Sequence, residues 1–110
     1  MRNKNPLTEL KYPNLRPSWW VSTCDERENL IGDNSFYDSF QKKEIAFDIL
    51  SRLETLPEGG FIDFYKQDQK WFYKNLLMLH KNSNGDLKRL TANGRFIKFD
   101  LENFKERNGI

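Results

Sequence analysis

Residues 70–81, KWFYKNLLMLHK, decide the fold of this chain because they are compatible with two kinds of secondary structure. As a helix, the segment gathers its apolar side chains on one side and places Lys74 and Asn75 on the other. As a strand, its three consecutive aromatic residues suit pleated packing, although the adjacent polar pair interrupts a regular alternation. The segments on either side therefore have to be interpreted with both possibilities open.

The clearest helix lies upstream, over residues 39–56, SFQKKEIAFDILSRLETL. Its apolar residues recur at intervals of three and four and form one stripe, which consists of Ile45, Ala46, Ile49, Leu50, Leu53 and Leu56. Ser35 or Ser39 can cap its start, and Pro57 ends it. Residues 61–66, FIDFYK, follow a glycine pair and are rich in rings, which predicts a strand.

Two Asn-Gly pairs downstream, at positions 84–85 and 93–94, predict tight hairpin turns. Residues 87–92 and 95–99 would pair across the second turn. Asp100 then stands where it can cap a short C-terminal helix over residues 101–107.

The first 34 residues indicate an extended N-terminal arm, because Pro6, Pro13 and Pro17 restrict the backbone and remove hydrogen-bond donors. Its leucines and tryptophans are too apolar for a free tail, so we expect the arm to pack on the rest of the chain. A chain of 110 residues is too short for two separate cores. We therefore predict one domain over residues 35–110, with the arm, residues 1–34, packed on it.

Two architectures follow from the two interpretations of residues 70–81. If the segment is a strand, the chain is an α+β protein with one main amphipathic helix packed on a small antiparallel β-meander of three to four strands, followed by a short C-terminal helix. If it is a helix, the order of elements is similar to that of a winged-helix domain, with residues 85–99 as the wing. We expect the first architecture and keep the second as the alternative.

Charge is distributed unevenly along the chain, although the net charge is only +2. Between Lys66 and Lys98 there are eight basic and two acidic residues, interleaved with the aromatic triplet at 71–73. Positive charge beside flat rings is what phosphates and bases attract. The competing interpretation is that these lysines are solvated residues that protect a strand edge from aggregation.

We therefore predict a non-enzymatic binding protein that associates with nucleic acid through its basic C-terminal half. The predicted phosphate contacts are Lys70, Lys74, Lys88, Arg89, Arg95 and Lys98. Trp71 and Tyr73 are the candidates for stacking on bases.

The alternative prediction is a protein–protein interaction or inhibitor module, such as an accessory protein of a mobile element. Arg16, Trp19 and Trp20 would anchor a protein partner, since tryptophan and arginine are favoured at interface centres. Glu44 and Asp48, on the polar side of the predicted helix, would contact a basic partner.

Catalytic and cofactor signals are weak. His80 and Cys24 are the only histidine and the only cysteine, and nothing in their spacing brings them together. No Gly-rich phosphate loop or histidine–carboxylate metal motif occurs, so we expect neither a metal nor an organic cofactor. A metal-free nuclease that uses Tyr65 or Tyr73 with Arg89 is a third alternative.

The single cysteine excludes an internal disulfide, and no apolar run approaches the roughly 18 residues that a membrane helix needs. No apolar stretch follows the first residues, so we expect no signal peptide. These features favour a cytoplasmic protein without a membrane partner.

Overall fold

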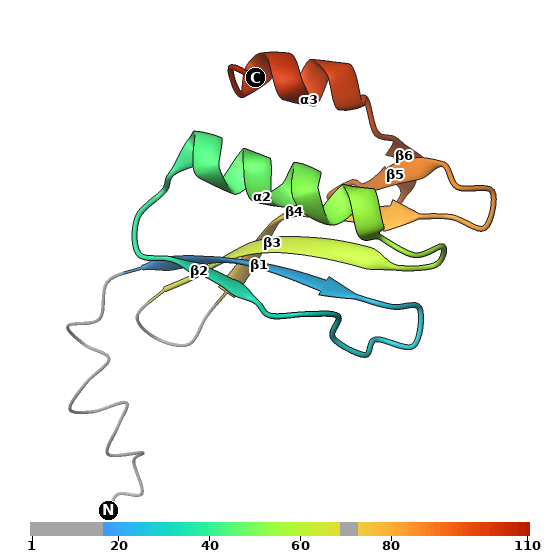
Figure 1. The fold of residues 1–110 in the computed structure, drawn as a ribbon, viewed down its shortest axis with the longest axis horizontal. Helices are drawn as coiled ribbons and strands as arrows, with labels where there is room; N and C mark the ends of the chain where they lie inside the picture. Colours follow the sequence, from blue (N-terminus) through green and yellow to red (C-terminus); the bar gives the residue numbers. More distant parts are fainter. Residues whose placement is uncertain (1–16, 69–72) are drawn as a thin grey trace, which may run out of the picture.

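The computed structural model describes residues 17–68 and 73–110, which form an α+β fold (Figure 1). The described elements, in chain order, are β1 (Ser18–Cys24), β2 (Ser35–Tyr37), α2 (Lys42–Thr55), β3 (Phe61–Gln67), β4 (Tyr73–Lys81), β5 (Leu87–Leu90), β6 (Phe96–Lys98) and α3 (Leu101–Arg107). The six strands pair antiparallel in the order β2-β1-β3-β4-β5-β6. The predicted α+β class is confirmed.

The ambiguous segment is a strand, so the winged-helix-like alternative is wrong. β4 pairs with β3 on one side and with β5 on the other. The register shifts at Phe64/Tyr65, where Leu77 pairs with Phe64 but Asn75 pairs with Tyr65. This bulge leaves Leu76 as an extra residue and moves Asn75 to the face opposite Leu77. The apolar residues after the bulge can therefore face the core despite the broken alternation.

The sheet is larger than the predicted meander of three to four strands, because residues 18–24 and 35–37 are also strands. β1 lies inside the sheet, between β2 and β3. Residues 18–24 thus belong to the sheet, although the sequence predicts them as part of an extended arm packed on the domain. The run SWWVSTC is rich in aromatic and β-branched residues, which suit a pleated surface. The arm before Pro17 lies outside the described residues.

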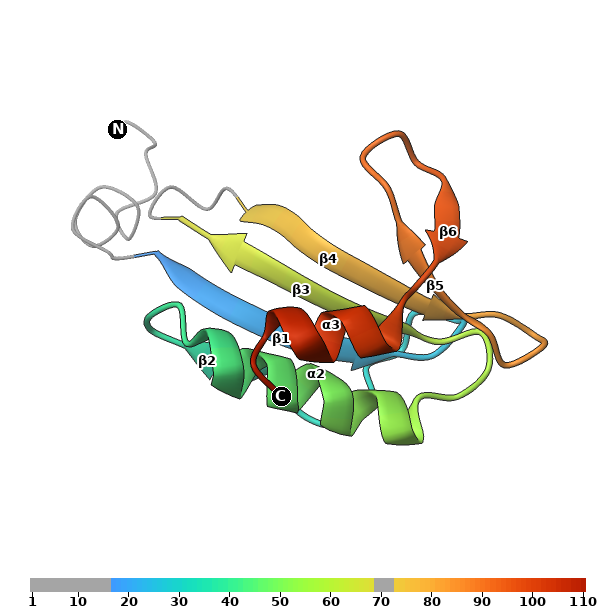
Figure 2. The same cartoon turned by 90° about the horizontal axis from the view of Figure 1, so that it is seen from above.

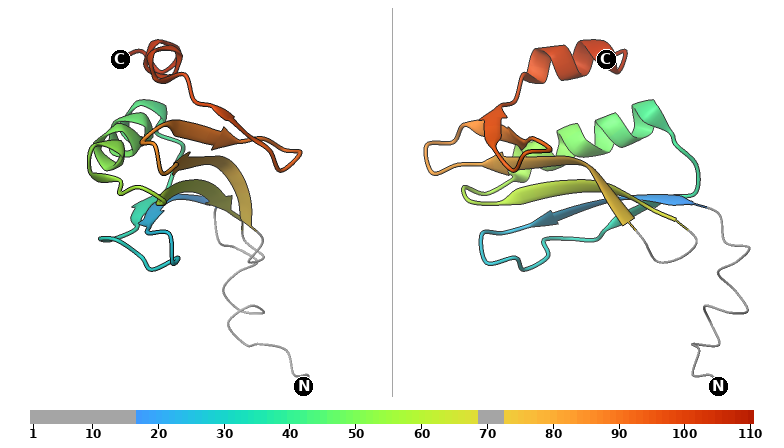
Figure 3. Two further views of the ribbon diagram at one scale, coloured as in Figure 1. Left: turned by 90° about the vertical axis from the view of Figure 1, so that its right-hand side faces the viewer. Right: turned by 180° about the vertical axis from the view of Figure 1, so that it is seen from behind.

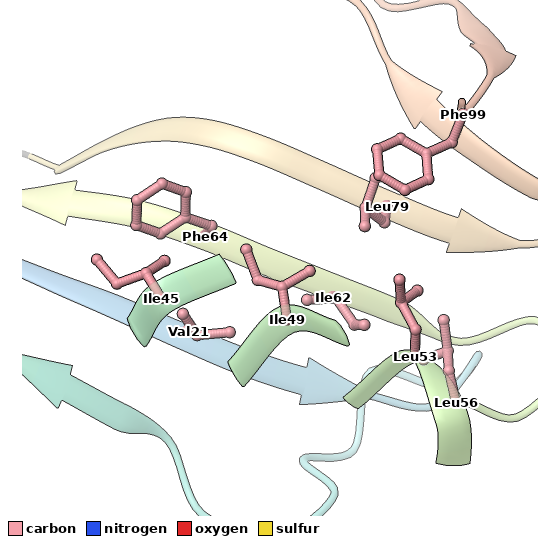
Figure 4. Packing of buried hydrophobic residues seen from close by; sticks show 9 residues of the cluster. All are labelled: Val21, Ile45, Ile49, Leu53, Leu56, Ile62, Phe64, Leu79 and Phe99. Atoms are coloured by element: carbon pink, nitrogen blue, oxygen red, sulfur yellow. The ribbon is translucent and has the colours of Figure 1, made fainter. Parts of the chain in front are cut away.

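The predicted main helix is confirmed as α2, which begins later than Ser39 and has no side-chain cap at its N-cap residue, Gln41. Its apolar stripe packs on the sheet, where Val21, Ile62 and Leu79 are fully buried (Figure 4). Burying each such side chain contributes about 1.5–3 kcal/mol. The core therefore fills the layer between α2 and the strands, and the sheet curves around the helix (Figure 3).

The C-terminal elements agree with the predictions made from the sequence. Gly85 and Gly94 have φ angles of 83° and 81°, as the predicted Asn-Gly turns require. The Asp100 side chain accepts a hydrogen bond from the backbone N–H of Asn103 at 3.0 Å, which caps α3. Helix α3 has no buried residue. It lies on the same side of the sheet as α2 and farther from the strands (Figures 1 and 2).

Candidate functional site

The sheet has two unlike faces, and the pairing register assigns its side chains to them. Val21, Ile62 and Leu79 point toward α2. Since successive residues of a strand point to opposite sides, their neighbours Trp20, Phe61 and His80 point away from the helix. We call this second surface the open face. Both described helices lie on the other side of the sheet (Figure 3).

Three aromatic side chains from adjacent strands form a first ring cluster on the open face: Phe36 on β2, Trp20 on β1 and Tyr65 on β3. Trp20 pairs with Phe36 and with Tyr65 in the register. The Trp20 ring is edge-on to Phe36 at 5.0 Å and nearly parallel to Tyr65 at 6.5 Å between centroids. Its indole Nε1–H donates to Ser18 Oγ, and Phe36 is 55% exposed. The cluster is held in place by its neighbours while remaining accessible.

A second ring cluster lies near the other ends of β1 and β3 and consists of Phe61, His80 and Phe96. His80 stacks on Phe61 with 4.4 Å between ring centroids and lies 5.3 Å from the ring of Phe96. Nδ1 of His80 is 3.0 Å from the carbonyl oxygen of Gly60. A carbonyl oxygen only accepts hydrogen bonds, so Nδ1 carries the hydrogen and Nε2 is the acceptor in the neutral ring.

Two lysines border the second ring cluster. His80 pairs with Lys88, and Lys88 pairs with Lys98 on the edge strand β6. Within residues 17–68 and 73–110, no carboxylate lies within ion-pair distance of either lysine. Like charges directly opposite each other destabilise an antiparallel pair. An anion bound on this side of the open face would remove that repulsion.

One carboxylate, that of Asp63, lies between the two ring clusters. It pairs with Ser22 and Met78 in the register and accepts a hydrogen bond from the Asn75 amide. Burial raises the pKa of Asp63, and the hydrogen bond from Asn75 only partly opposes this effect. The charged form is therefore disfavoured at the centre of the open face.

The other predicted phosphate contacts do not join Lys88 and Lys98 on this surface. Arg89 pairs with Leu79 and so points to the helix-covered side. Lys74 pairs with Lys66 at the far end of β4, and Arg95 is exposed in the turn between β5 and β6.

The structure does not assign the predicted stacking residues to the open face. Tyr73 begins β4, and Trp71 lies outside the described residues together with Lys70.

The two tryptophans of the alternative prediction point in opposite directions. Trp19 faces the helix side, with its ring 6.1 Å from that of Phe40 and 5.4 Å from Nζ of Lys66. Trp20 belongs to the open face. Glu44 is exposed on α2, and Arg16 lies outside the described residues.

Asp48 is not part of a solvated acidic helix face, since it lies within an internal polar network. Its carboxylate accepts hydrogen bonds from Tyr37 at 2.7 Å and from Arg52 at 2.8 Å. Arg52 also donates to the Thr23 and Ser35 hydroxyls and to the Asp33 carbonyl. The network fastens α2 to β1, β2 and the loop between these strands.

The internal polar network shifts the pKa values of Asp48 and Tyr37. Burial raises the pKa of Asp48, but hydrogen bonds from Ser35, Tyr37 and Arg52 and the charge of Arg52 outweigh it and leave the pKa below its ordinary value. Burial, together with the hydrogen bond to Asp48 and its negative charge, raises the pKa of Tyr37 to about 12.

Two of the catalytic pairs considered above, Cys24 with His80 and Tyr65 with Arg89, are not brought together. Cys24 and His80 both pair with Phe61, one on each side of β3, so two strand spacings, about 10 Å, separate their backbones. Tyr65 and Arg89 point to opposite faces of the sheet. Among the described residues, no group of three or more His, Cys, Asp or Glu side chains could hold a metal ion.

The ring clusters were missed from sequence because they depend on pairing between distant strands. The alternation in residues 18–24 signals a strand and could have placed Trp20 on an outer face. Nothing local indicates that Phe36, Phe61 and Phe96 share that face.

Comparison with protein-family models, with curated proteins and with solved structures finds no match for this chain. Neither described helix has the length and apolar character that crossing a bilayer requires. The function is therefore inferred from the geometry of the open face.

Proposed function

We propose that this protein binds single-stranded nucleic acid across the open face of its sheet, without catalysing a reaction. Unpaired bases stack on the ring clusters, and the phosphates lie against Lys88 and Lys98. The observation that carries this proposal is the register that places the Phe61–His80–Phe96 cluster directly beside two lysines that form no ion pair with any described residue.

A single strand fits this surface better than a duplex. In a duplex the faces of the bases are covered by their neighbours, whereas an unpaired strand can turn its bases onto aromatic side chains. Stacking of one base on an aromatic side chain contributes about 1–3 kcal/mol. Phe36 and Phe96 are 55% and 45% exposed, so each cluster has a ring accessible to a base.

The distribution of charged residues around the open face favours one path for the bound nucleic acid. The loop between β1 and β2 carries Asp25, Glu26, Glu28 and Asp33, and it leaves the sheet at the same end as the second ring cluster. Three strand spacings, about 14 Å, separate β1 from β5. The phosphates would avoid the acidic loop and follow the β5–β6 side, where Lys88 and Lys98 lie.

The test is a titration of dye-labelled single-stranded DNA and RNA, followed by fluorescence anisotropy at two salt concentrations. We expect Lys88→Gln combined with Lys98→Gln to weaken binding and to reduce the salt slope by about 1.4, or about 0.7 for each lost phosphate contact on a single strand. Phe96→Ala should weaken binding by about tenfold at both salt concentrations, because stacking does not release counterions.

The matched control is Lys43→Gln combined with Lys105→Gln, which removes the same charge from the two helices. This variant should bind like the wild type. Equal losses in both double variants would mean that only net charge matters and would contradict binding at the open face. Absence of binding at low salt would remove the proposal altogether.

A further inference from the structure

A cleft of about 510 Å³ lies on the helix-covered side of the sheet, between α2, α3 and the strands. Its volume is within the range of small-molecule sites, about 300–1,000 Å³. The cleft exists because α3 has no buried residue and lies farther from the sheet than α2 (Figure 1). It lies on the side of the sheet opposite the open face, and Lys98 is the one residue of the proposed function that also lines it.

The lining of the cleft includes apolar side chains from both layers of the fold. Ile45 and Ile49 contribute from α2, Phe64 from β3, and Phe99 and Phe104 from the C-terminal segment. The rings of Phe99 and Phe104 are tilted by 55° with 5.5 Å between their centroids. Phe40, which precedes α2, is the fourth phenylalanine of the lining, and four such rings in one cleft favour a flat aromatic body over a flexible chain.

The charged lining is strongly positive. Lys42 on α2, Arg89 on β5 and Arg107 on α3 all line the cleft, and no carboxylate in the described part of the chain is within ion-pair distance of them. Lys98 also lines it, although its register with Lys88 directs its side chain toward the open face. The carboxylate in the lining is that of Asp100, and it is engaged in capping α3.

Two asparagines of the lining provide polar groups near the phenylalanines. Asn108 donates from Nδ2 to the Phe104 carbonyl at 2.7 Å, which leaves its Oδ1 as an acceptor. Asn103 is exposed, and its backbone N–H bonds to Asp100. Amide side chains of this kind can pair with the edge of a nucleobase.

We propose that this cleft is a binding site for a nucleoside monophosphate. The base packs on Phe99 and Phe104, and the phosphate binds Arg89 and Arg107, with Lys42 near its second charge. Arginine forms two-pronged hydrogen bonds with phosphate oxygens, and three cations suit a ligand with about two negative charges better than a single carboxylate.

Isothermal titration calorimetry with adenosine 5′-monophosphate tests the site. We expect saturable binding of one nucleotide per chain, weaker by about tenfold or more in Arg89→Gln combined with Arg107→Gln, because charge-assisted hydrogen bonds to phosphate are stronger than those between neutral groups. Should this variant fail to fold, two neighbouring lysines replace it: Lys42→Gln should weaken binding by at least threefold, and Lys43→Gln, outside the cleft, should leave it unchanged.

Three further ligands test separately whether the cleft recognises the phosphate, the base and a flat aromatic body. Adenosine without phosphate and inorganic phosphate without a base should each bind at least tenfold more weakly than the nucleotide. Dodecyl phosphate that binds as tightly as the nucleotide would indicate a site for alkyl chains and would overturn the proposal. Equal affinity of the Lys42→Gln and Lys43→Gln variants for the nucleotide would also overturn it. The absence of nucleotide binding by the wild type would do the same.

The cleft and the open face can be tested independently. Lys88→Gln should bind the nucleotide like the wild type, because Lys88 does not line the cleft. Loss of nucleotide binding in this variant would place the nucleotide on the open face and would contradict a separate site.

Discussion

Arg52 is the side chain that connects most of the separate parts of the structure. It forms an ion pair with Asp48, and its side chain and that of Asp48 are only 14% and 16% exposed. Its remaining hydrogen bonds reach β1, β2 and the loop between them. Removing one partner of a largely buried pair leaves the other charge uncompensated, which costs about 3–5 kcal/mol.

Arg52→Met should therefore lower the free energy of unfolding by about 3 kcal/mol, measured from the midpoint of urea unfolding. Lys105→Met is the matched control, because it removes an exposed pair with Glu102 at 3.7 Å. The control should change stability by less than about 1 kcal/mol. Similar effects of the two variants would show that the Arg52 network has no special role.

The Tyr37–Asp48 hydrogen bond makes stability depend on pH at both ends of the scale. The pKa of Asp48 is lowered in the folded protein, so its contribution is present above about pH 4 and is lost as the pH falls through the folded value. The pKa of Tyr37 is raised to about 12, so its contribution is present below about pH 10 and is lost as the pH rises through about 12.

Tyr37→Phe should be less stable than the wild type by about 1 kcal/mol at neutral pH, because it lacks this hydrogen bond. The difference should shrink as the pH rises from about 10 to about 12, where the Tyr37 phenol ionises. Urea unfolding of both proteins across this range measures the difference. A difference in the free energy of unfolding that does not change with pH would contradict the raised pKa of Tyr37.

Asp63 offers a gain-of-function prediction at the centre of the open face. Its pKa is raised by burial, so the neutral substitution Asp63→Asn removes a disfavoured charge while keeping an acceptor for the Asn75 amide. Affinity for single-stranded nucleic acid should rise by about fivefold at neutral pH, or about 1 kcal/mol, because the bound strand passes Asp63 where it crosses from one ring cluster to the other. Unchanged or weaker binding would place the phosphates away from Asp63.

Among the elements, those with a strong local signal could be predicted from the sequence. The stripe of Ile45, Ile49 and Leu53 predicted α2, and the Asn-Gly pairs predicted both hairpins, because these signals come from neighbours along the chain. β4 could not be assigned, since its bulge disguises the alternation. Residues 18–24 differ from the predicted arm because their strand is completed only by pairing with β3, some 40 residues later.

The Asp100 cap allows the stability of a single element to be tested, because α3 makes few contacts with the rest of the chain. Asp100→Ala removes the cap and should destabilise α3 by about 1 kcal/mol. Because α3 has no buried residue, the loss should appear as faster hydrogen exchange in residues 101–107 and leave β3 and β4 protected. Asp100→Asn, which keeps a capping oxygen, should behave like the wild type; uniform destabilisation in Asp100→Ala would contradict a local role.

At the scale of the whole molecule, the sheet separates cations that are adjacent in the sequence. Lys88 and Arg89 are consecutive, yet a strand directs them to opposite faces. The basic segment predicted as one patch thus contributes to two surfaces, the open face with its rings and the cleft below α3. Composition alone indicates that basic residues are abundant here, but their grouping follows from the register.

Binding of nucleic acid at the open face can be located residue by residue by NMR chemical-shift mapping. A short single-stranded oligonucleotide without terminal phosphates would be titrated into isotope-labelled protein. We predict that the largest shifts occur at Phe61, Tyr65, His80, Lys88 and Phe96. Shifts confined to α2 and α3, or none at a saturating concentration, would contradict the account.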